Sequence, residues 1–273
     1  MKKIIPILAL LSVFVFLNCS KSNSSEEEVT KIDKSTNLLG TGDSAGDILS
    51  NTKYDKLLLE IGYVQGFKPT TTAIADLIEF LKERTFKENI EIQYQELDSP
   101  EKESLTISDI DKIVQENRTA YNSGSTLAIY IYFADAPSDG DEPEADLVTL
   151  GAAFRNTSMV IFESTVRELA GKSILISTGT VETATLNHEF GHLFGLVNIG
   201  SDMVNPHEGE MEITNDDGTT EIVPSQHCNQ DNCLMRAELE FASAMGKMLT
   251  AKNGQVPDLD TECLLDLKAN GGR

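Results

Sequence analysis

The sequence is short of positive charge. Its 273 residues include 22 lysines and arginines against 44 aspartates and glutamates, which gives a formal net charge of −22. Binding to phosphate groups needs a basic surface, so this balance excludes nucleic acid as a partner. Low-complexity tracts are also lacking, and 40% of the residues are hydrophobic. These properties exclude a disordered or collagen-like chain and predict one large domain, or two small ones, with an ordinary buried core.

The apolar run at the N-terminus is too short to cross a bilayer, because a spanning helix needs about 20 apolar residues and this run covers only 4–17. Lys2 and Lys3 precede the run, as in an export signal. Cys19 follows it, and the next residues are polar. The pattern resembles a bacterial lipoprotein signal, so we expect a lipid anchor at Cys19 and a location in the cell envelope, on the outer membrane or the cell surface. Asn18 stands where a small residue is usual, which leaves plain secretion as the alternative.

Cysteine is scarce as well. With Cys19 assigned to the lipid, only Cys228, Cys233 and Cys263 remain. Three is an odd number. In an oxidising compartment, two of them can form a disulfide and leave one free thiol, or all three can bind a metal.

Hydrophobic periodicity predicts alternating strands and helices up to the middle of the chain. The expected elements are a strand at 57–61, a helix at 71–84, a strand at 90–94, a helix capped by Ser108 and a buried strand at 127–133. Two further strands, 148–154 and 158–162, are close enough to pair in an antiparallel manner. The order predicts an α/β (or α+β) fold with a mixed sheet and one antiparallel edge strand.

The segment 135–146 interrupts this pattern with two prolines and six acidic residues. Calcium prefers oxygen ligands, so the segment is either a Ca²⁺ site or a solvated loop. It has no fixed ligand spacing.

Histidine is rare, and all four histidines fall between His188 and His227. The stretch from His188 to His192 reads His-Glu-Phe-Gly-His, on a helix for which Thr180 is the predicted cap. Imidazoles four residues apart lie on one helical face and can bind one zinc ion, while Glu189 between them can act as a general base. A helix that carries two histidines by chance is the alternative.

Gly195 extends the motif to His-Glu-x-x-His-x-x-Gly, which resembles the metzincin metallopeptidases. Their third histidine lies three residues beyond the glycine, where this chain has Asn198. Further along, His227 is followed by a cysteine, four residues, another cysteine, one residue and Met235. This second part resembles the archaemetzincin pattern, so the two halves of one motif are separated here by residues 198–226.

Three residues compete for the place of third zinc ligand. Asn198 has the usual spacing, but a neutral amide oxygen is a poor zinc ligand beside imidazole. His207 lies inside the inserted segment and can instead be a pocket-wall residue. We favour His227, because the resemblance places it directly before the turn that carries Met235.

The inserted segment 198–226 contains two short apolar stretches, 211–213 and 221–223, around the turn sequence at 215–218. This arrangement predicts a β-hairpin. Because the hairpin emerges between the second and third expected ligands, we expect it beside the cleft, as part of a substrate pocket wall.

The metzincin resemblance implies a mixed five-stranded sheet whose antiparallel edge strand pairs with an extended peptide, an active-site helix and a small, mostly helical C-terminal subdomain. It also implies one catalytic zinc ion above the turn at Met235. Archaemetzincins add a second zinc on four cysteines. This chain has only Cys263 at that point, with Asp260 and Asp266 on either side, so we favour a disulfide over a zinc site of three cysteines and one aspartate.

The sequence therefore divides into a signal peptide, a lipidated tether, a catalytic subdomain, an insertion and a C-terminal subdomain, at 1–18, 19–50, 51–197, 198–226 and 227–273. We predict a monomeric zinc endopeptidase that acts on a protein or peptide substrate, with metal ligands His188, His192 and His227 and the catalytic base Glu189. Two alternatives remain open. One is an idle envelope lipoprotein that uses the same fold as a binding module, and the other is a zinc hydrolase of non-peptide amides.

Overall fold

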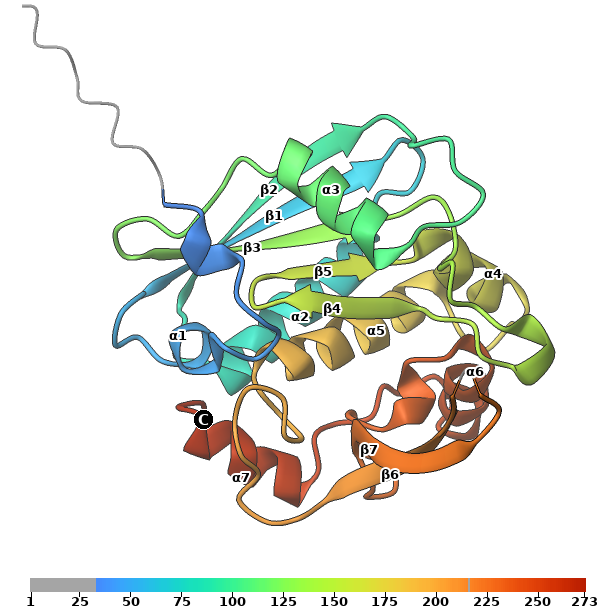
Figure 1. The fold of residues 1–273 in the computed structure, drawn as a ribbon. Helices are drawn as coiled ribbons and strands as arrows, with labels where there is room; N and C mark the ends of the chain where they lie inside the picture. The colour runs from blue at the N-terminus through green and yellow to red at the C-terminus, as the bar shows by residue number, and fades with distance from the viewer. Residues whose placement is uncertain (1–32, 216) are drawn as a thin grey trace, which may run out of the picture. The chain divides into compact units, whose positions relative to one another are not determined.

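A five-stranded sheet forms the centre of the structure, a computed structural model that describes residues 33–215 and 217–273 (Figure 1). The predicted signal peptide and the lipid site at Cys19 lie outside the described residues. The strands are β1 (Lys56–Val64), β2 (Asn89–Leu97), β3 (Thr126–Phe133), β4 (Gly151–Arg155) and β5 (Ser158–Ile161). Their order is β2-β1-β3-β5-β4, and every pair is parallel except β4 with β5. The predicted fold class, with its antiparallel edge strand, is confirmed.

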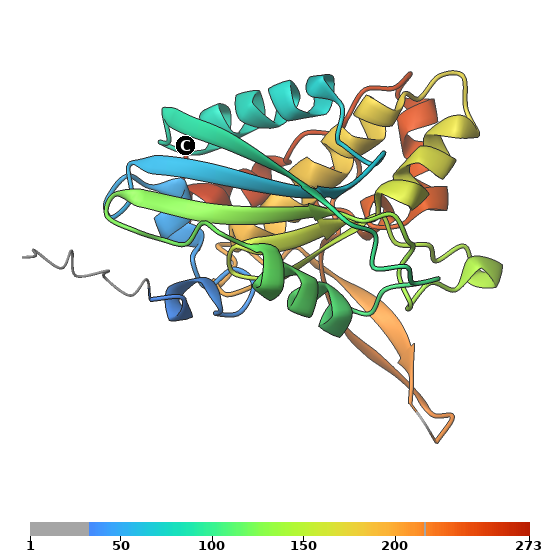
Figure 2. The ribbon, with the colours of Figure 1, turned by 90° about the horizontal axis from the view of Figure 1, so that it is seen from above.

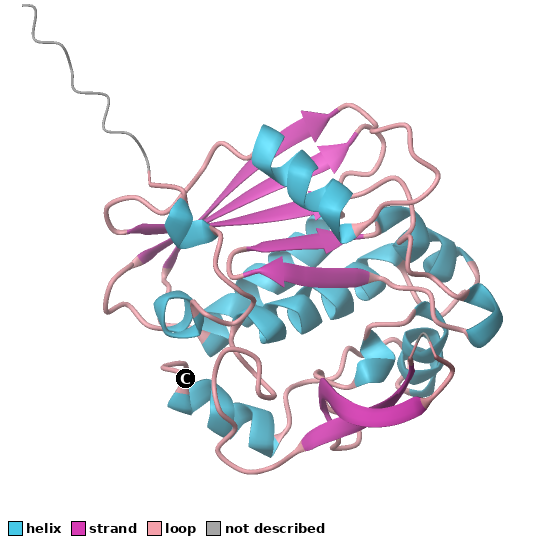
Figure 3. Cartoon of the chain, viewed as in Figure 1, coloured by secondary structure: helices cyan, strands magenta, loops and turns pink. Residues whose placement is uncertain are grey.

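Helices cover both faces of the sheet, as Figures 2 and 3 show. The longer ones are α2 (Thr71–Arg84), α3 (Ile107–Asn117), α4 (Glu163–Gly171) and α5 (Thr178–Leu193). Strand β3 explains the division, because its side chains alternate between the two faces. Ile129 and Ile131 pack in one core with residues of α2 and α5. Tyr130 and Tyr132 pack in a second core with residues of α3.

The helix starts follow from their caps. The helix α2 has the predicted bounds, and the side chain of Thr70 caps it. The predicted caps of α3 and α5 are wrong. Thr106 and Asp109 form a reciprocal capping box at the start of α3, which satisfies two backbone donors where Ser108 would satisfy one. Ser177 caps α5 by accepting from the backbone N–H of Thr180.

The folded unit reaches further towards the N-terminus than the division at residue 50 implies. The short helices η1 (Ser35–Asn37) and α1 (Ala45–Leu49) belong to it. Ile48 and Leu49 are fully buried in the larger core. The side chain of Asn37 is buried and donates to the backbone oxygen of Ala128 at 3.2 Å. Elements this short have no measurable periodicity, so the sequence pattern did not predict them.

The C-terminal part lies against the side of α5 that faces away from the sheet (Figure 1). It contains the hairpin strands β6 (Glu208–Thr214) and β7 (Thr220–Cys228), the short helix η3 (Ala237–Leu239), and the helices α6 (Ala242–Ala251) and α7 (Thr261–Ala269). A further short helix, η2 (Pro143–Ala145), lies in the acidic loop. The predicted hairpin is present and longer than expected, and Figure 2 shows it projecting from the body. Within the described residues, no helix has both the length and the apolarity needed to cross a bilayer.

Candidate metal centres and cleft

The helix α5 places His188 and His192 one turn apart in a buried position. Both imidazoles are less than one-tenth exposed. Gly191 lies between them, at a position where Met235 packs too close to the helix backbone to leave room for a side chain. A Cβ at this position would lie 2.0 Å from Sδ of Met235. The turn that carries Met235 therefore packs directly beneath the histidine pair.

His227, at the end of β7, completes a group of three imidazoles. One ring nitrogen from each lies within 4.8 Å of the others. The Nδ1 atom of His188 donates to the backbone oxygen of Leu234 at 2.8 Å, and Nδ1 of His227 donates to that of Ser225 at 2.7 Å. A carbonyl oxygen only accepts, so each Nδ1 carries a hydrogen, and in the neutral imidazole Nε2 is then the atom with the lone pair.

These residues fit a zinc ion. In a tetrahedral site with Zn–N bonds of about 2.0–2.1 Å, two ligand nitrogens lie about 3.3–3.4 Å apart. The Nε2 atoms of His188 and His192 are 3.2 Å apart. The Nε2 atom of His227 is buried and has no hydrogen-bond partner among the described residues. Burial, with His227 nearby, lowers the pKa of His188 to about 3, so this imidazole is neutral, as a metal ligand must be.

Glu189 stands beside this group with one oxygen held and the other free. Its Oε2 atom accepts from the backbone N–H of Ala153 on β4 at 2.7 Å. Its Oε1 atom is buried and has no partner within the described part of the chain. Burial, and next the nearby Glu240, raises the pKa of Glu189 well above its usual value. A carboxyl group in this position can accept a proton at Oε1 without leaving its anchor.

A cleft of about 430 Å³ opens onto these residues. Glu189, His192 and His227 line it, together with residues of β4 and of the loop after α5. Glu240 also lines the cleft, and its Oε2 atom lies 3.3 Å from Nε2 of His227. The sequence analysis missed Glu240, and only its position shortly after Met235 could have indicated it.

The other two candidates for the third ligand lie elsewhere. His207 is fully buried, and its Nε2 atom lies 3.6 Å from Sγ of Cys263 and 3.5 Å from Oδ2 of Asp266. Asn198 lines the cleft, but its amide donates to Oε2 of Glu208 at 3.2 Å. Of the three candidates, only His227 meets the pair on α5.

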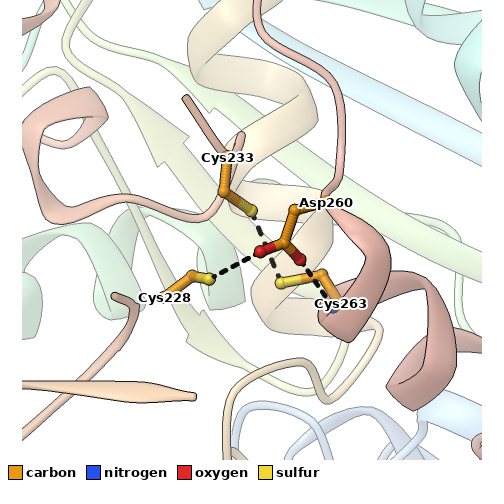
Figure 4. A group of neighbouring side chains, drawn as sticks. All are labelled: Cys228, Cys233, Asp260 and Cys263. Atoms are coloured by element: carbon orange, nitrogen blue, oxygen red, sulfur yellow. Dashed lines mark hydrogen bonds between the residues drawn. The ribbon is translucent and has the colours of Figure 1, made fainter. Parts of the chain in front are cut away.

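A second group of side chains that can bind a metal, here called the sulfur cluster, includes the residue that follows His227. Sulfur and oxygen atoms of Cys228, Cys233, Asp260 and Cys263 lie within 4.8 Å of one another (Figure 4). The three thiols are free, so the expectation of a disulfide is wrong for this structure. The physical reason is that all three sulfurs converge on one point with a carboxylate, which is the arrangement of a tetrahedral zinc site.

Backbone donors support the sulfur cluster. The N–H of Gln230 donates to Sγ of Cys228, and the N–H of Met235 donates to Sγ of Cys233, each at 3.3 Å. The neighbouring thiols of Cys228 and Cys263 lower the pKa of Cys233 to about 3. Such donors stabilise thiolates, and thiolates are the form of cysteine that binds metal.

The acidic loop gives no support to the Ca²⁺ expectation. In the described part of the chain, three or more His, Cys, Asp or Glu side chains come together in two groups, the histidine group and the sulfur cluster. Neither group includes residues 135–146. Asp141 instead accepts from the backbone N–H of Thr149 at 2.8 Å, which fixes the loop locally.

Comparison with solved structures finds a similar one, the crystal structure of archaemetzincin from Methanopyrus kandleri. The match covers 79% of this chain and 96% of that chain, at 15% sequence identity and a TM-score of 0.47. No protein-family model matches the sequence, and no curated protein matches it either.

Proposed function

We propose that the chain is a zinc-dependent endopeptidase. The ion is held by His188, His192 and His227, and Glu189 is the general base. The observation that carries this proposal is the convergence of three buried imidazoles beside a buried carboxylate whose Oε1 atom has no partner among the described residues. An idle binding module has no need of that carboxylate, so its presence favours an enzyme.

The chemistry divides between the ion and the chain. Zinc on three imidazoles supplies a Lewis acid that polarises a carbonyl group and lowers the pKa of water towards neutrality. Glu189 takes one proton from the attacking water at Oε1, while the N–H of Ala153 holds its Oε2 atom in place. Glu189 then gives that proton to the nitrogen of the leaving amine as the peptide bond breaks. The protein shell around the site fixes both groups before the substrate arrives.

Metal analysis combined with a peptide assay tests the proposal. Protein purified without chelators should cleave an unfolded protein substrate, lose this activity to a chelator and regain it with zinc. Glu189→Gln protein provides the control, since it should bind zinc and remain inactive. Zinc-loaded parent protein that cleaves neither proteins nor peptides would favour the binding module, and cleavage of small amides alone would favour the non-peptide hydrolase.

A structural zinc on Cys228, Cys233, Cys263 and Asp260 is part of the same proposal. The group offers four ligand atoms, which is the number that zinc binds in a tetrahedral structural site. Cys228 directly follows His227, so this ion would also fix the third catalytic ligand.

We further propose that a lipid on Cys19 holds the enzyme at the bacterial envelope. Labelling cells with a fatty-acid analogue should mark the parent protein. A Cys19→Ser variant should lose the label and appear in the soluble fraction, whereas a labelled variant would contradict the assignment.

A further inference from the structure

The outer edge of β4 is the surface to which a substrate main chain would add as a strand. The N–H of Phe162 donates to the backbone oxygen of Leu150 at 2.9 Å. Because strand groups alternate in direction, the carbonyl of Ala152 also points to β5, and Gly151 and Ala153 direct their backbone groups away from it. Ala153 shows this directly, because its N–H donates to Glu189 and its carbonyl accepts from the hydroxyl of Thr41 at 3.2 Å. Among the described residues, the outward backbone groups without a partner are therefore those of Gly151.

The edge is occupied before Gly151. The N–H of Leu150 donates to the backbone oxygen of Glu240 at 3.0 Å, and the N–H of Ala242 donates to that of Val148 at 2.8 Å. This antiparallel bridge is why β4 begins later than the sequence predicts. A substrate strand therefore cannot pair with this part of the edge.

The edge is also occupied after Ala153, by the chain's own N-terminal segment, residues 36–44 (Figure 1). The N–H of Asn156 donates to the backbone oxygen of Leu39 at 3.1 Å, and the N–H of Leu39 donates to Oδ1 of Asn156 at 3.1 Å. The amide of the fully buried Asn156 also donates to the backbone oxygen of Thr36 at 2.8 Å and to the hydroxyl of Ser44 at 2.7 Å. The contacts fix the segment at both of its ends.

The same segment borders the cleft. Thr41 lines it, together with Ile199 and Gly200 of the loop after α5. At Gly42, whose φ is +82°, a Cβ would lie 2.2 Å from the backbone oxygen of Ile199. The backbone at Gly42 thus packs against the loop after α5, so the segment bounds the cleft at this place.

We propose that residues 36–44 are a fixed stop that determines substrate length on one side of the cleaved bond. This inference rests on the proposed peptidase function. From Leu150 to Ala153 the edge is about 10 Å long, room for about three substrate residues. Beyond Thr41 a bound chain must end or turn into solvent, so further residues on that side add no binding.

The opposite side of the cleft is open. Gln226, His227 and Glu240 line both the cleft and a neighbouring cavity of about 730 Å³ beside the hairpin. Substrate residues on that side can leave the edge of β4 and contact the walls of this cavity. Length dependence should therefore be one-sided.

Binding of intact peptides to zinc-loaded Glu189→Gln protein tests the proposal without catalysis. Two series of peptides would be used, one lengthened at the amino end and the other at the carboxyl end, each from about two to about eight residues. The longest peptide, fully extended, would measure about 26 Å. Calorimetric dissociation constants should stop improving after about two added residues in one series and continue to fall in the other. Continued improvement of more than about tenfold in both series would overturn the stop. Parent protein that hydrolyses none of these peptides would instead count against the peptidase function.

A Thr41→Val variant adds a second test, since it keeps the side-chain shape and frees the carbonyl of Ala153. Peptides long enough to reach Ala153 should bind about two- to tenfold more tightly to this variant, made in the Glu189→Gln background, because one backbone hydrogen bond becomes available. Thr52→Val, at an exposed position before β1, is the matched control and should change nothing. Unchanged binding to the Thr41→Val variant would show that Thr41 does not limit the substrate.

Discussion

At the level of single residues, the peptidase proposal depends most on Glu189. Glu189→Gln keeps an oxygen to accept from the N–H of Ala153 but cannot take a proton. We expect zinc content to be unchanged and kcat/KM to fall by about two to four orders of magnitude. Exposed Glu168 on α4, replaced in the same way, is the control. Undiminished turnover in the Glu189 variant would mean that another group activates the water.

The third ligand is testable in the same manner. His227→Ala should weaken binding of the catalytic zinc strongly, because it leaves two imidazoles. His207→Ala should leave that zinc in place, since His207 contacts Cys263 and Asp266 instead. Zinc titration of both variants distinguishes them. Parent-like zinc binding in His227→Ala alone would show that the two motif halves do not form one site.

A buried carboxyl pair makes stability depend on pH. Glu163 is fully buried near Glu182, and Arg167 donates to it at 2.6 Å. Burial, and next the charge of Glu182, raises the pKa of Glu163 from 4.5 to about 8. Between these values the folded chain keeps a proton that the unfolded chain releases. The stabilisation is complete below about pH 4.5 and is lost as pH rises through about 8.

Glu163→Gln removes this titration and keeps a donor and an acceptor. The free energy of unfolding of the variant should therefore fall less between about pH 5 and about pH 8 than that of the parent. In the parent, Glu163 alone lowers this free energy by up to about 1.4 kcal/mol per pH unit. Denaturant unfolding at both pH values measures the difference. Equal slopes in parent and variant would contradict the assignment.

At the level of elements, the hairpin can be separated from the metal site. Glu208 pairs with Cys228 at its base, and Glu210 pairs with Pro224 one step out. Replacing residues 211–223 by Asn-Gly should close the strands with a short turn and leave zinc binding intact. Removing a wall of the neighbouring cavity should lower kcat/KM for peptides that reach it. Unchanged selectivity towards a peptide library would show that the hairpin does not contact substrate.

The elements that the sequence predicted well are those with local signals. The helix α2 has a full apolar stripe, and its bounds were predicted correctly. Strand β4 was predicted too long because its first part bonds to residues 240–242, a partner far along the chain. The caps at Thr106 and Ser177 were missed because several hydroxyl residues stand at each helix start and only the backbone geometry selects one.

At the level of the whole molecule, the chain should carry about two zinc ions, one in each group of ligands. Cys263→Ser should retain about one ion and unfold at a lower temperature, because structural zinc contributes folding free energy. Metal analysis and thermal unfolding of parent and variant test this. A parent protein with about one ion, and a variant of equal stability, would contradict the second site.

The fold class followed from the alternation of strands and helices, and the histidine pair followed from spacing on one helix. The sulfur cluster was only the less favoured alternative to a disulfide. Its members come from the end of β7, the turn near Met235 and the start of α7, so spacing alone selects neither this site over a disulfide nor Asp260 over Asp266. The short N-terminal helices at either end of the cleft stop were not predicted either.

The separation of Cys233 and Cys263 makes the sulfur cluster sensitive to which arrives first, metal or oxidant. Their sulfurs are 3.5 Å apart, so a modest rotation of either side chain would bring them into bonding range. If the chain is exported, as its N-terminus predicts, oxidant and zinc compete for the same two thiols. A chain in which these two thiols are oxidised before zinc binds loses two of the four ligands of the sulfur cluster. The yield of protein with both metal sites intact would then depend on the relative speed of metal delivery and thiol oxidation.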